Sequence, residues 1–418
     1  MSGLAFVDRK VLAWAFYDWA NSAFALSVLA VLFPLFLGSY WNVGASGADV
    51  TARLAWITSG TSALICILSP IFGTIADAGG YRKRFLFILA TLGALSTAAL
   101  GFVDEGLWPW ALAFYGLGLI GYYGSMIFYD SLIVDVTAPR FYSAVSAMGF
   151  AVGYLGGAVL LGLHVFMLMD PSRFGFDTAN DVIRFAFITV GAWWAIFALP
   201  ILALVPESKA QLKVVGGVVR TAFSELKSTI IAVGQYRNVV LFLVAYCLYI
   251  GGVFTVIFMA VNYGQRLGFS QQDLVMALLI TNFVGFPATL IHGYFGHRFG
   301  PRKGLYFALS VYVIVSTLAV FMTDVREFYA MAIVVGCVQG GVQGLSRSFF
   351  ATLIPSGQPG EFFGFYNMVT KFSHVVGPAL VGVAATFSDA PEWVLLVLIP
   401  LFVVGGGLLA MVQSPARR

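Results

Sequence analysis

Residues 11–38 form an apolar run in which Asp18 is the only side chain that is normally charged near neutral pH. A helix of these 28 residues, at about 1.5 Å per residue, can cross a hydrocarbon core about 30 Å thick. An acid inside a membrane helix is costly unless it faces a partner or a water-filled cavity, so Asp18 marks a candidate functional site. Asp18, Asn21, Ser22 and Ala25 recur at helical spacing, and we expect this stripe to face a cavity.

The composition of the whole chain supports this membrane interpretation. Of its 418 residues, 60% are hydrophobic and only 10% are charged, against about 25% charged in soluble domains. The net charge is +4, and the basic residues lie in short loops and not on one basic face, so nucleic acid is not an expected partner. We therefore expect the lipid bilayer to be the main surrounding of the chain.

Apolar runs bounded by charges or turns predict an all-α membrane protein with twelve transmembrane helices. The predicted helices are 11–38, 53–77, 85–103, 108–135, 142–169, 182–205, 238–266, 272–298, 302–322, 327–355, 361–388 and 391–413. The long connection 206–237 mixes charges with apolar residues at helical spacing, which is typical of an amphipathic linker on the membrane surface. We expect a six-helix bundle at 1–205, this cytoplasmic linker at 206–237, and a second six-helix bundle at 238–418.

Lysine and arginine are distributed unequally between the two sets of predicted loops. If the N-terminus is cytoplasmic, sixteen of these residues lie on the cytoplasmic side and only five on the opposite side. Cytoplasmic loops of membrane proteins carry an excess of lysine and arginine. The sequence therefore predicts that both termini lie in the cytoplasm.

The two halves of the chain carry related loops. The segment GTIADAGGYRKR begins at Gly73, between the second and third predicted helices. The segment GYFGHRFGPRK begins 220 positions later, at Gly293, between the eighth and ninth predicted helices. Internal symmetry of this kind implies two similar bundles around a central site.

Both loops resemble the signature of the major facilitator superfamily, Gly-x-x-x-Asp-Arg-x-Gly-Arg-Arg. The first copy matches it at Gly73, Asp77, Gly80 and Arg82. The second copy matches at its glycines and arginines and has His297 in place of the acid. The resemblance implies two six-helix bundles that form a transporter, with the first, fourth, seventh and tenth helices lining a central cavity.

Within this superfamily, three stretches resemble the vacuole-effluxer group, the relatives of the autophagy-related vacuolar amino-acid effluxer. They are FYDWANSA at 16–23, GFAVGYLGG at 149–157, and QGGVQGLSRSFFATLIP at 339–355, which runs on toward Asn367. Membership implies export of small solutes, with amino acids as the cargo of the best-known fungal member. The chain departs from the group at Asp130, where asparagine is expected.

Placing the polar residues on this framework gives an acidic N-terminal bundle and a basic C-terminal bundle. The predicted substrate-binding or coupling residues are Tyr17, Asp18, Asn21, Tyr123, Asp130, Tyr246, Tyr249, Gln339, Gln343, Arg347, Asn367 and Lys371. The Gln339, Gln343 and Arg347 series follows successive i+4 steps, so these three side chains share one helix face.

A zwitterionic or anionic solute can place an ammonium group near Asp18 and a carboxylate near Arg347, whose guanidinium suits bidentate binding. Burial disfavours the charged form of a carboxyl group, so a proton on Asp18 or Asp130 can couple export to a proton gradient. Two other interpretations stay open. Asp18 can pair with Arg347 or Lys371 only to neutralise buried charge, and Asp130 can form a peripheral salt bridge.

The repeated loops predict a gate next to the central cavity. The expected gate residues are Asp77, Arg82, Arg84, Asp135, Arg298 and Arg302. As the superfamily resemblance suggests, their arginines bridge acids of neighbouring helices in the outward-facing state, while the loop glycines permit tight turns. The alternative is that these charges only set the topology.

We expect a secondary active transporter and not an enzyme, because the sequence has no nucleophile–base pair, phosphate loop or metal constellation. No cofactor or metal is expected, and a monomer in a bacterial plasma membrane is the favoured state. Small zwitterionic solutes, amino acids first, are the leading cargo, and the proton is the candidate coupling ion. A lysophospholipid, sugar or organic acid as substrate, a transporter-like receptor, and a vacuolar or lysosomal location remain open.

Overall fold

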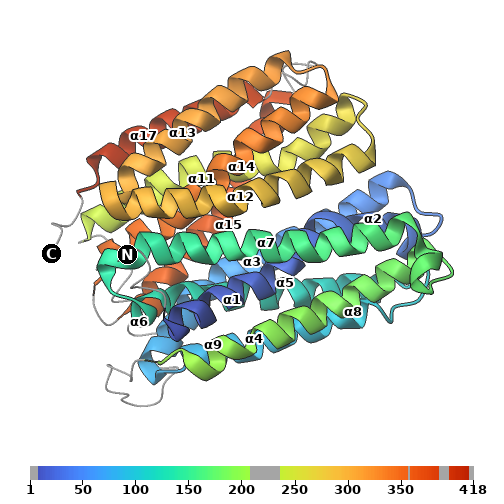
Figure 1. The fold of residues 1–418 in the computed structure, drawn as a ribbon, viewed down its shortest axis with the longest axis horizontal. Helices are drawn as coiled ribbons and strands as arrows, with labels where there is room; N and C mark the ends of the chain where they lie inside the picture. The colour runs from blue at the N-terminus through green and yellow to red at the C-terminus, as the bar shows by residue number, and fades with distance from the viewer. Residues whose placement is uncertain (1–7, 208–235, 356–357, 386–394, 414–418) are drawn as a thin grey trace.

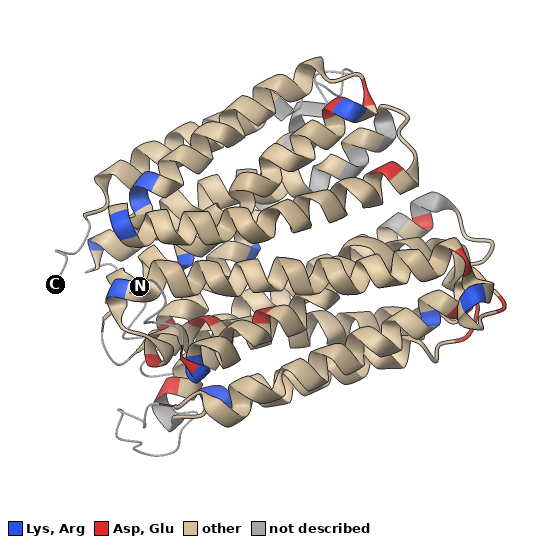
Figure 2. Ribbon diagram, viewed as in Figure 1, with Lys and Arg blue, Asp and Glu red and all other residues tan. Residues whose placement is uncertain are grey.

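A computed structural model describes residues 8–207, 236–355, 358–385 and 395–413, and it is helical throughout these ranges apart from the connecting turns. Ten of the described helices are long and apolar enough to cross a membrane, and Leu396–Met411 is a shorter apolar helix. Figure 2 shows that most charged residues lie at the two ends of these helices and that the middle sections are nearly uncharged. The structure therefore confirms an all-α membrane protein.

The N-terminal half matches the first six predicted spans (Figure 1). Its elements are α1 (Arg9–Ala23), the π-helix η1 (Phe24–Leu32), α2 (Phe33–Phe36), the π-helix η2 (Leu37–Trp41), α3 (Gly47–Gly79), α4 (Arg82–Leu100), α5 (Trp108–Ser131), α6 (Ile133–Val136), η3 (Pro139–Phe141), α7 (Tyr142–Met169), η4 (Pro171–Phe174), α8 (Ala179–Phe197) and α9 (Leu199–Leu204). The first span continues to Trp41, beyond the predicted end at residue 38.

The described part of the C-terminal half supplies four of the ten long apolar helices, and it also contains α15 (Pro359–Ala385) and the shorter apolar helix near the C-terminus. Its elements are α11 (Arg237–Arg266), α12 (Gln271–Phe299), α13 (Pro301–Leu318), η5 (Ala319–Phe321), α14 (Val325–Leu353), α15 (Pro359–Ala385), η6 (Leu395–Leu398) and α17 (Ile399–Met411). The predicted amphipathic linker at 206–237 falls almost wholly on residues 208–235, which lie outside the described ranges. Its secondary structure, and the domain boundaries that depend on it, stay predictions.

The first span changes from α-helix to π-helix at Phe24. Pro34 follows directly after this region and has no N–H for the carbonyl of Ala30, so the regular α-helical bonding pattern cannot continue through it. π-Helical turns are frequent at functional sites. Here the π-helical segment forms part of the wall of the central cavity.

The two repeated loops each contain a glycine in a positive-φ conformation, which a residue with a Cβ rarely adopts. Gly80 ends α3 with φ of +64°, and Gly300 ends α12 with φ of +91°. The tight turns expected of these loops are therefore present at both matching positions.

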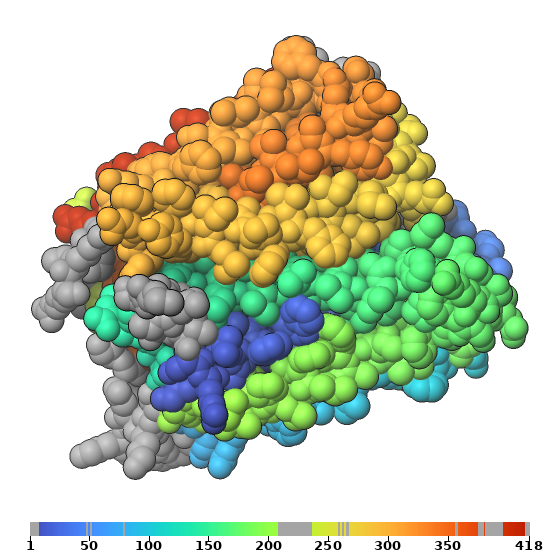
Figure 3. All heavy atoms as spheres, viewed as in Figure 1, coloured from blue at the N-terminus to red at the C-terminus, as the bar shows by residue number. Residues whose placement is uncertain are grey.

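The helices of the N-terminal half, coloured blue to green, pack against those of the C-terminal half, coloured yellow to red (Figure 3). On the face shown there, α7 runs along α12, and a Cβ added at Gly293 of α12 would lie 2.6 Å from the Cβ of Ala147 of α7. Elsewhere α3 approaches α15, where a Cβ at Gly364 would lie 2.6 Å from the carbonyl oxygen of Ser69. These two helix pairs form much of the interface between the halves.

Candidate functional site

A cavity of ≈1010 Å³ lies between the two halves. Its polar inner part includes Asp18 of α1, Asp130 of α5, Arg347 of α14 and Lys371 of α15. Its wall also extends to the ends of the helices that lie farthest from the chain termini. There, Leu54 of α3 lines the cavity together with residues of α2, α12 and α14. The cavity thus runs from a buried charged region toward one end of the molecule.

At the opposite end, which carries the described starts of α1 and α11, contacts between α3 and α15 close the interface. The backbone N–H of Glu361 donates to Oδ2 of Asp77 at 2.9 Å. Gly73 lies directly against the backbone of Gly360, and a Cβ there would overlap the carbonyl group. A side chain at Gly73 is therefore incompatible with this approach of the two helices.

A second set of contacts closes the same end, between α7 and the preceding η3 on one side and the helices α12 and α14 on the other. The hydroxyls of Ser143 and Ser348 share a hydrogen bond of 3.2 Å, and both serines are buried. The imidazole of His297 lies 2.8 Å from the carbonyl oxygen of Arg140. Together with the α3–α15 contact, these bonds separate the cavity from the end that holds the termini.

Arg347 is the centre of the buried charge cluster and has an exposed fraction of 0%. Its Nη1 donates to Oδ1 of Asp130 at 2.9 Å. Its Nε donates to the hydroxyl of Ser146 at 2.8 Å, and its Nη2 donates to the carbonyl oxygen of the same residue at 2.8 Å. One arginine of α14 therefore bonds to both α5 and α7 of the other half.

Asp18 is the second acid beside this arginine, and its Oδ2 lies 3.8 Å from Nη2 of Arg347. The same oxygen accepts a 2.9 Å hydrogen bond from the hydroxyl of Tyr129. The ring of Tyr129 stacks on Trp14 at a centroid distance of 4.5 Å, which fixes the position of its hydroxyl. Of the two partners that the sequence left open for Asp18, Arg347 and Lys371, it is Arg347 that lies within ion-pair distance.

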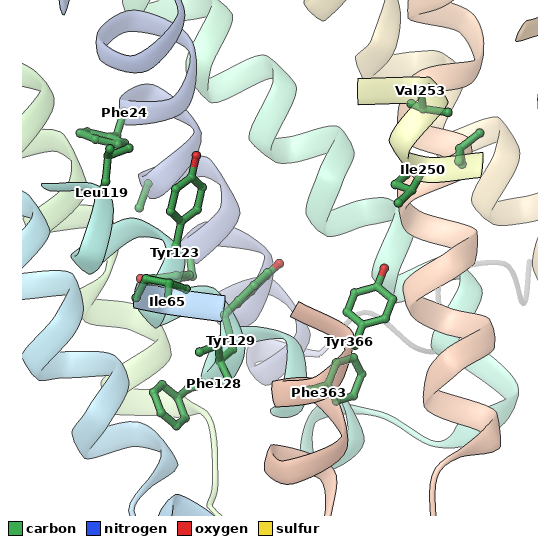
Figure 4. Packing of buried hydrophobic residues seen from close by; sticks show 14 of the residues in the cluster. Phe24, Ile65, Leu119, Tyr123, Phe128, Tyr129, Ile250, Val253, Phe363 and Tyr366 are labelled. Atoms are coloured by element: carbon green, nitrogen blue, oxygen red, sulfur yellow. The ribbon is translucent and has the colours of Figure 1, made fainter. Parts of the chain in front are cut away.

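Asn367 and Lys371 bring α15 to the same region. Nδ2 of Asn367 donates to Oδ2 of Asp130 at 3.1 Å, so this acid bridges α14 and α15 through its two oxygens. Nζ of Lys371 lies 3.2 Å from the centre of the Tyr123 ring. Figure 4 shows Tyr123 and Tyr129 on one side of this region and Tyr366 of α15 on the other.

Amide and hydroxyl groups extend the polar wall away from the charges. The hydroxyl of Tyr154 donates to Oε1 of Gln343 at 3.2 Å. Gln339, one helical turn before Gln343 on α14, also lines the cavity. The hydroxyl of Tyr246 shares a 3.1 Å hydrogen bond with that of Thr370. These neutral groups can orient a polar solute without adding charge.

Most of the predicted binding residues line this one cavity. They are Asp18, Tyr123, Asp130, Tyr246, Gln339, Gln343, Arg347, Asn367 and Lys371. Ser22 and Ala25 of the predicted stripe on the first helix line it as well. The predicted series Gln339, Gln343 and Arg347 does share a face, and that face is turned to the cavity.

Tyr17, Asn21 and Tyr249, by contrast, are not among the residues that line the cavity. Tyr17 packs inside the N-terminal half, 5.2 Å from the ring of Tyr129. Nδ2 of Asn21 lies 3.1 Å from the sulfur of Met126, and the hydroxyl of Tyr249 bonds to Ser346 at 2.8 Å. Helical spacing groups these residues with polar neighbours, but packing within each bundle turns them away from the solute space.

The predicted gate residues separate into two groups. Arg82 lies 3.5 Å from Oδ1 of Asp77 and 2.8 Å from Oδ2 of Asp135, which joins the loop after α3 to α6. Arg84 is exposed and lies over the Tyr81 ring. In the second loop, Arg298 lies over the Phe299 ring, and Arg302 donates to the carbonyl oxygen of Val412.

The first loop therefore forms an ion-pair network within its own half and contacts the other half through the bond from Glu361 to Asp77. The two loops are alike in sequence but differ in their contacts, because His297 replaces the acid of the first copy. Instead of forming an ion pair with an arginine of its own loop, that histidine contacts the backbone of the opposite half.

Two polar residues of the cluster, Tyr129 and Ser146, were not among the predicted site residues. Tyr129 directly precedes Asp130, so on an ideal helix it points about 100° away from it. Ser146 lies three residues before Gly149, on a glycine-rich helix. The sequence alone gives no signal for this contact, because the contact depends on how α7 and α14 lie against each other.

Within the described residues, no group of three or more His, Cys, Asp or Glu side chains is placed to hold a metal ion. The three cysteines Cys66, Cys247 and Cys337 are free. The polar chemistry of the cavity is therefore that of its carboxylates, cations, amides and hydroxyls.

Comparisons with known proteins agree with this architecture. A family model described as "Vacuole effluxer Atg22 like" matches residues 48–139 and 139–417. An uncharacterized MFS-type transporter, YxiO of Bacillus subtilis (strain 168), is 36% identical over 405 residues, which cover 96% of this chain and 94% of that protein. Autophagy-related protein 22 of Coccidioides immitis (strain RS) is 25% identical over 461 residues, covering 91% and 75% respectively.

Solved structures share the fold at low sequence identity. The human organic anion transporter MFSD10 (TETRAN) matches with a TM-score of 0.75 and 16% identity, covering 96% of this chain and 99% of that one. The proton:xylose symporter XylE matches with a TM-score of 0.74 and 12% identity, covering 97% and 96%. The fold is thus that of the major facilitator superfamily, with its two six-helix bundles. The chain belongs to the vacuole effluxer Atg22-like family, as a multi-pass membrane transporter.

Proposed function

We propose that this transporter exports small zwitterionic solutes, with amino acids first, by alternating access. The observation that carries the proposal is the cluster of Asp18, Asp130, Arg347 and Lys371 at the inner part of one cavity. It presents both signs of charge to the same space, which suits a solute with an ammonium and a carboxylate. The family description, vacuole effluxer, supports outward transport.

The asymmetry of the interface supports alternating access. Bonds between the halves close the end that holds the termini, whereas the cavity extends toward the other end. If both termini lie in the cytoplasm, as the excess of cytoplasmic lysine and arginine predicts, this arrangement is the outward-facing one. Export then requires these contacts to part so that the solute can enter from the cytoplasm.

Proton coupling is part of the proposal. Asp18 faces the cavity and has one carboxylate oxygen bonded to Tyr129 and close to Arg347. A proton on this carboxyl group removes its attraction for Arg347, and so weakens one link between the halves. Binding of a proton and opening of the cytoplasmic end are then linked.

A lysophospholipid is the second candidate cargo, because much of the cavity wall is apolar. Leu29, Phe254 and Ile257 are among the lining residues, and a cavity of ≈1010 Å³ has room for part of an acyl chain. Sugars and organic acids are further candidates. A receptor function predicts binding of a solute without any counterflow.

We further propose a bacterial plasma membrane as the location, a monomer as the working unit, and 206–237 as the linker between the bundles. The similarity over almost the full length to a Bacillus subtilis transporter supports the location. Short loops between most of the helices, as Figure 1 shows, are also compatible with a compact bacterial transporter.

The function is tested by counterflow in proteoliposomes that contain the purified full-length chain. Vesicles loaded with an unlabelled amino acid are expected to accumulate the labelled one, and a lysophospholipid or sugar serves as the competing cargo. Counterflow of a lipid or sugar but not of any amino acid would reject the amino-acid assignment. Binding without counterflow of any of these solutes would reject transport in favour of a receptor.

The coupling is tested with Asp18→Asn, which keeps the size of the side chain and removes its ability to carry charge. We expect this variant to lose transport driven by a proton gradient while it retains counterflow. Asp104→Asn is the matched control, since Asp104 pairs with Arg184 at an exposed position and does not line the cavity. Unchanged gradient-driven transport in Asp18→Asn would remove Asp18 from the coupling mechanism.

A further inference from the structure

Lys371 lines the cavity with an ammonium group that has no hydrogen-bond or ion-pair partner among the described residues. Its exposed fraction is only 7%. An ammonium group is a donor only, and burial without an acceptor is costly. Nζ lies 3.2 Å from the centre of the Tyr123 ring. This cation–π contact does not supply an oxygen or nitrogen atom to accept a hydrogen bond from the ammonium group.

Arg347 is in the opposite situation, although it is the cation that the sequence suggests as the carboxylate site. Its Nε, Nη1 and Nη2 all donate at 2.8–2.9 Å to Ser146 and Asp130. Aromatic rings also enclose its guanidinium group, with Phe150 at 4.2 Å and Trp14 at 4.8 Å. A solute carboxylate can reach a bidentate position only by displacing these partners.

Both nearby acids are committed to the arginine side of the cluster. Asp130 uses one oxygen for Arg347 and the other for Asn367. Asp18 uses Oδ2 for Tyr129 and lies 3.8 Å from Arg347. The two carboxylates thus share one guanidinium group, and neither forms an ion pair with Lys371, whose ammonium group can pair with a group that enters through the cavity.

We propose that Lys371 binds the anionic group of the transported solute, a carboxylate, and that Arg347 joins the two bundles and does not bind solute. This assignment deepens the proposed function and rests on it for the presence of a solute in the cavity. A carboxylate that enters forms charge-assisted hydrogen bonds with donors that are already buried and unused. The ammonium end of a zwitterion then points toward Asp18, whose Oδ1 makes no hydrogen bond with the described residues.

These separate roles of Arg347 and Lys371 also explain why the two cations are on different helices. Arg347 on α14 contacts α5 and α7, so its bonds must form and break when the bundles move. The ammonium group of Lys371 on α15 makes a cation–π contact with a ring of α5, and such a contact tolerates displacement better than a directed hydrogen bond. Solute binding at Lys371 leaves the Arg347 bonds intact until the bundles separate.

The test compares carboxylate ligands with analogues in which an uncharged amide group replaces the carboxylate. Thermal shift and direct binding are measured for L-leucine against L-leucinamide, and for succinate against succinamide, on the full-length chain in detergent. Wild-type protein is expected to prefer the carboxylate of each pair. Lys371→Gln is expected to weaken carboxylate binding by about tenfold or more, in line with loss of a charge-assisted bond, and to leave amide binding within about threefold.

Three further variants separate the two roles. Lys371→Arg keeps a positive donor group and is expected to retain the preference for carboxylates. Arg347→Lys is expected to retain that preference too, while its melting temperature falls. Lys303→Gln is the matched control, because Lys303 is exposed on α13 and away from the cavity lining.

Several outcomes would overturn the assignment. Equal carboxylate binding in wild type and Lys371→Gln would do so, and so would loss of the preference in Arg347→Lys with its retention in Lys371→Gln. If wild type binds no carboxylate probe, the site does not exist as described. If succinate binds and shows the Lys371 dependence but no amino acid binds, amino-acid export fails while the assignment of Lys371 stands.

Discussion

Asp130→Asn tests whether the arginine cluster holds the two bundles together at the end that carries the termini. In the wild type, Oδ1 of Asp130 accepts from Arg347 at 2.9 Å and Oδ2 accepts from Asn367 at 3.1 Å. An asparagine has one acceptor oxygen and one donor NH₂ group. It can therefore satisfy only one of these two donors, and the other bond between the bundles is lost.

The size of the effect follows from the kind of bond that is lost. A hydrogen bond to a charged group contributes about 1.5–3 kcal/mol. If these bonds exist only while the end that holds the termini is closed, the loss shifts the equilibrium about 10- to 150-fold toward the open state, since each 1.4 kcal/mol is about tenfold. The fold should survive, because Ser146 still holds Arg347 through two bonds.

The assay is alkylation of a single cysteine placed at Ser348, in a chain whose three native cysteines are replaced. Ser348 has an exposed fraction of 1% and bonds to Ser143 across the closed interface. A maleimide reagent reaches this position only when the end opens, so its rate reports the open population. We expect Asp130→Asn to raise that rate about 10- to 150-fold, as long as the closed state remains the major one.

Asp104→Asn is the control variant for this alkylation assay. Asp104→Asn removes a carboxylate from an exposed ion pair and should leave the alkylation rate unchanged. If Asp130→Asn also leaves the rate unchanged in a folded protein, the cluster does not stabilise the closed state. A fall in the rate would mean that Asp130 favours the open state, which contradicts the reasoning directly.

Two other predictions concern packing and the ion-pair network of the first loop. Gly156→Leu should lower thermal stability by about 1–3 kcal/mol, because its Cβ alone would lie 2.7 Å from an indole carbon of α1. Arg82→Gln leaves Asp77 and Asp135 without their shared cation and should cost about 3–5 kcal/mol, whereas the exposed Arg84→Gln should cost little. Melting in detergent measures both, and equal melting temperatures for the two arginine variants would contradict the second.

The membrane spans were predictable because they depend on local composition. A run such as 11–38 has to be shielded from water along its whole length, whatever its neighbours are. Its helix continues to Trp41, with a π-helical section that no hydropathy pattern indicates. The turns at Gly80 and Gly300 were predictable for the same local reason, since a positive φ favours glycine.

The side-chain lining of the cavity was predictable only in part. Helical period shows which residues share a face, so Gln343 and Arg347 were grouped correctly. The period does not show how a helix is rotated within its bundle. Tyr17 and Tyr249 were therefore predicted to face the cavity, although packing against Tyr129 and Ser346 holds them inside their own halves.

The charges of Asp18 and Arg347 show most clearly which features follow from the sequence and which depend on tertiary packing. Their presence in apolar helices follows from the sequence, and so does the need for partners, because an isolated charge is too costly in such a setting. Which groups pair depends on distances between helices that are far apart in the chain. Ser146 and Tyr129, which complete the cluster, became recognisable only when α7 and α5 were placed beside α14 and α1.

The amino-acid sequence is enough to establish a twelve-helix membrane protein with a repeated loop and with charges of both signs in its interior, because hydrophobicity and helical period act locally. Tertiary packing decides that Arg347 is fully bonded across the bundles and that Lys371 is buried without an acceptor among the described residues. Hydrogen bonds require donor and acceptor to approach within about 3 Å, and only the assembled helices set those distances.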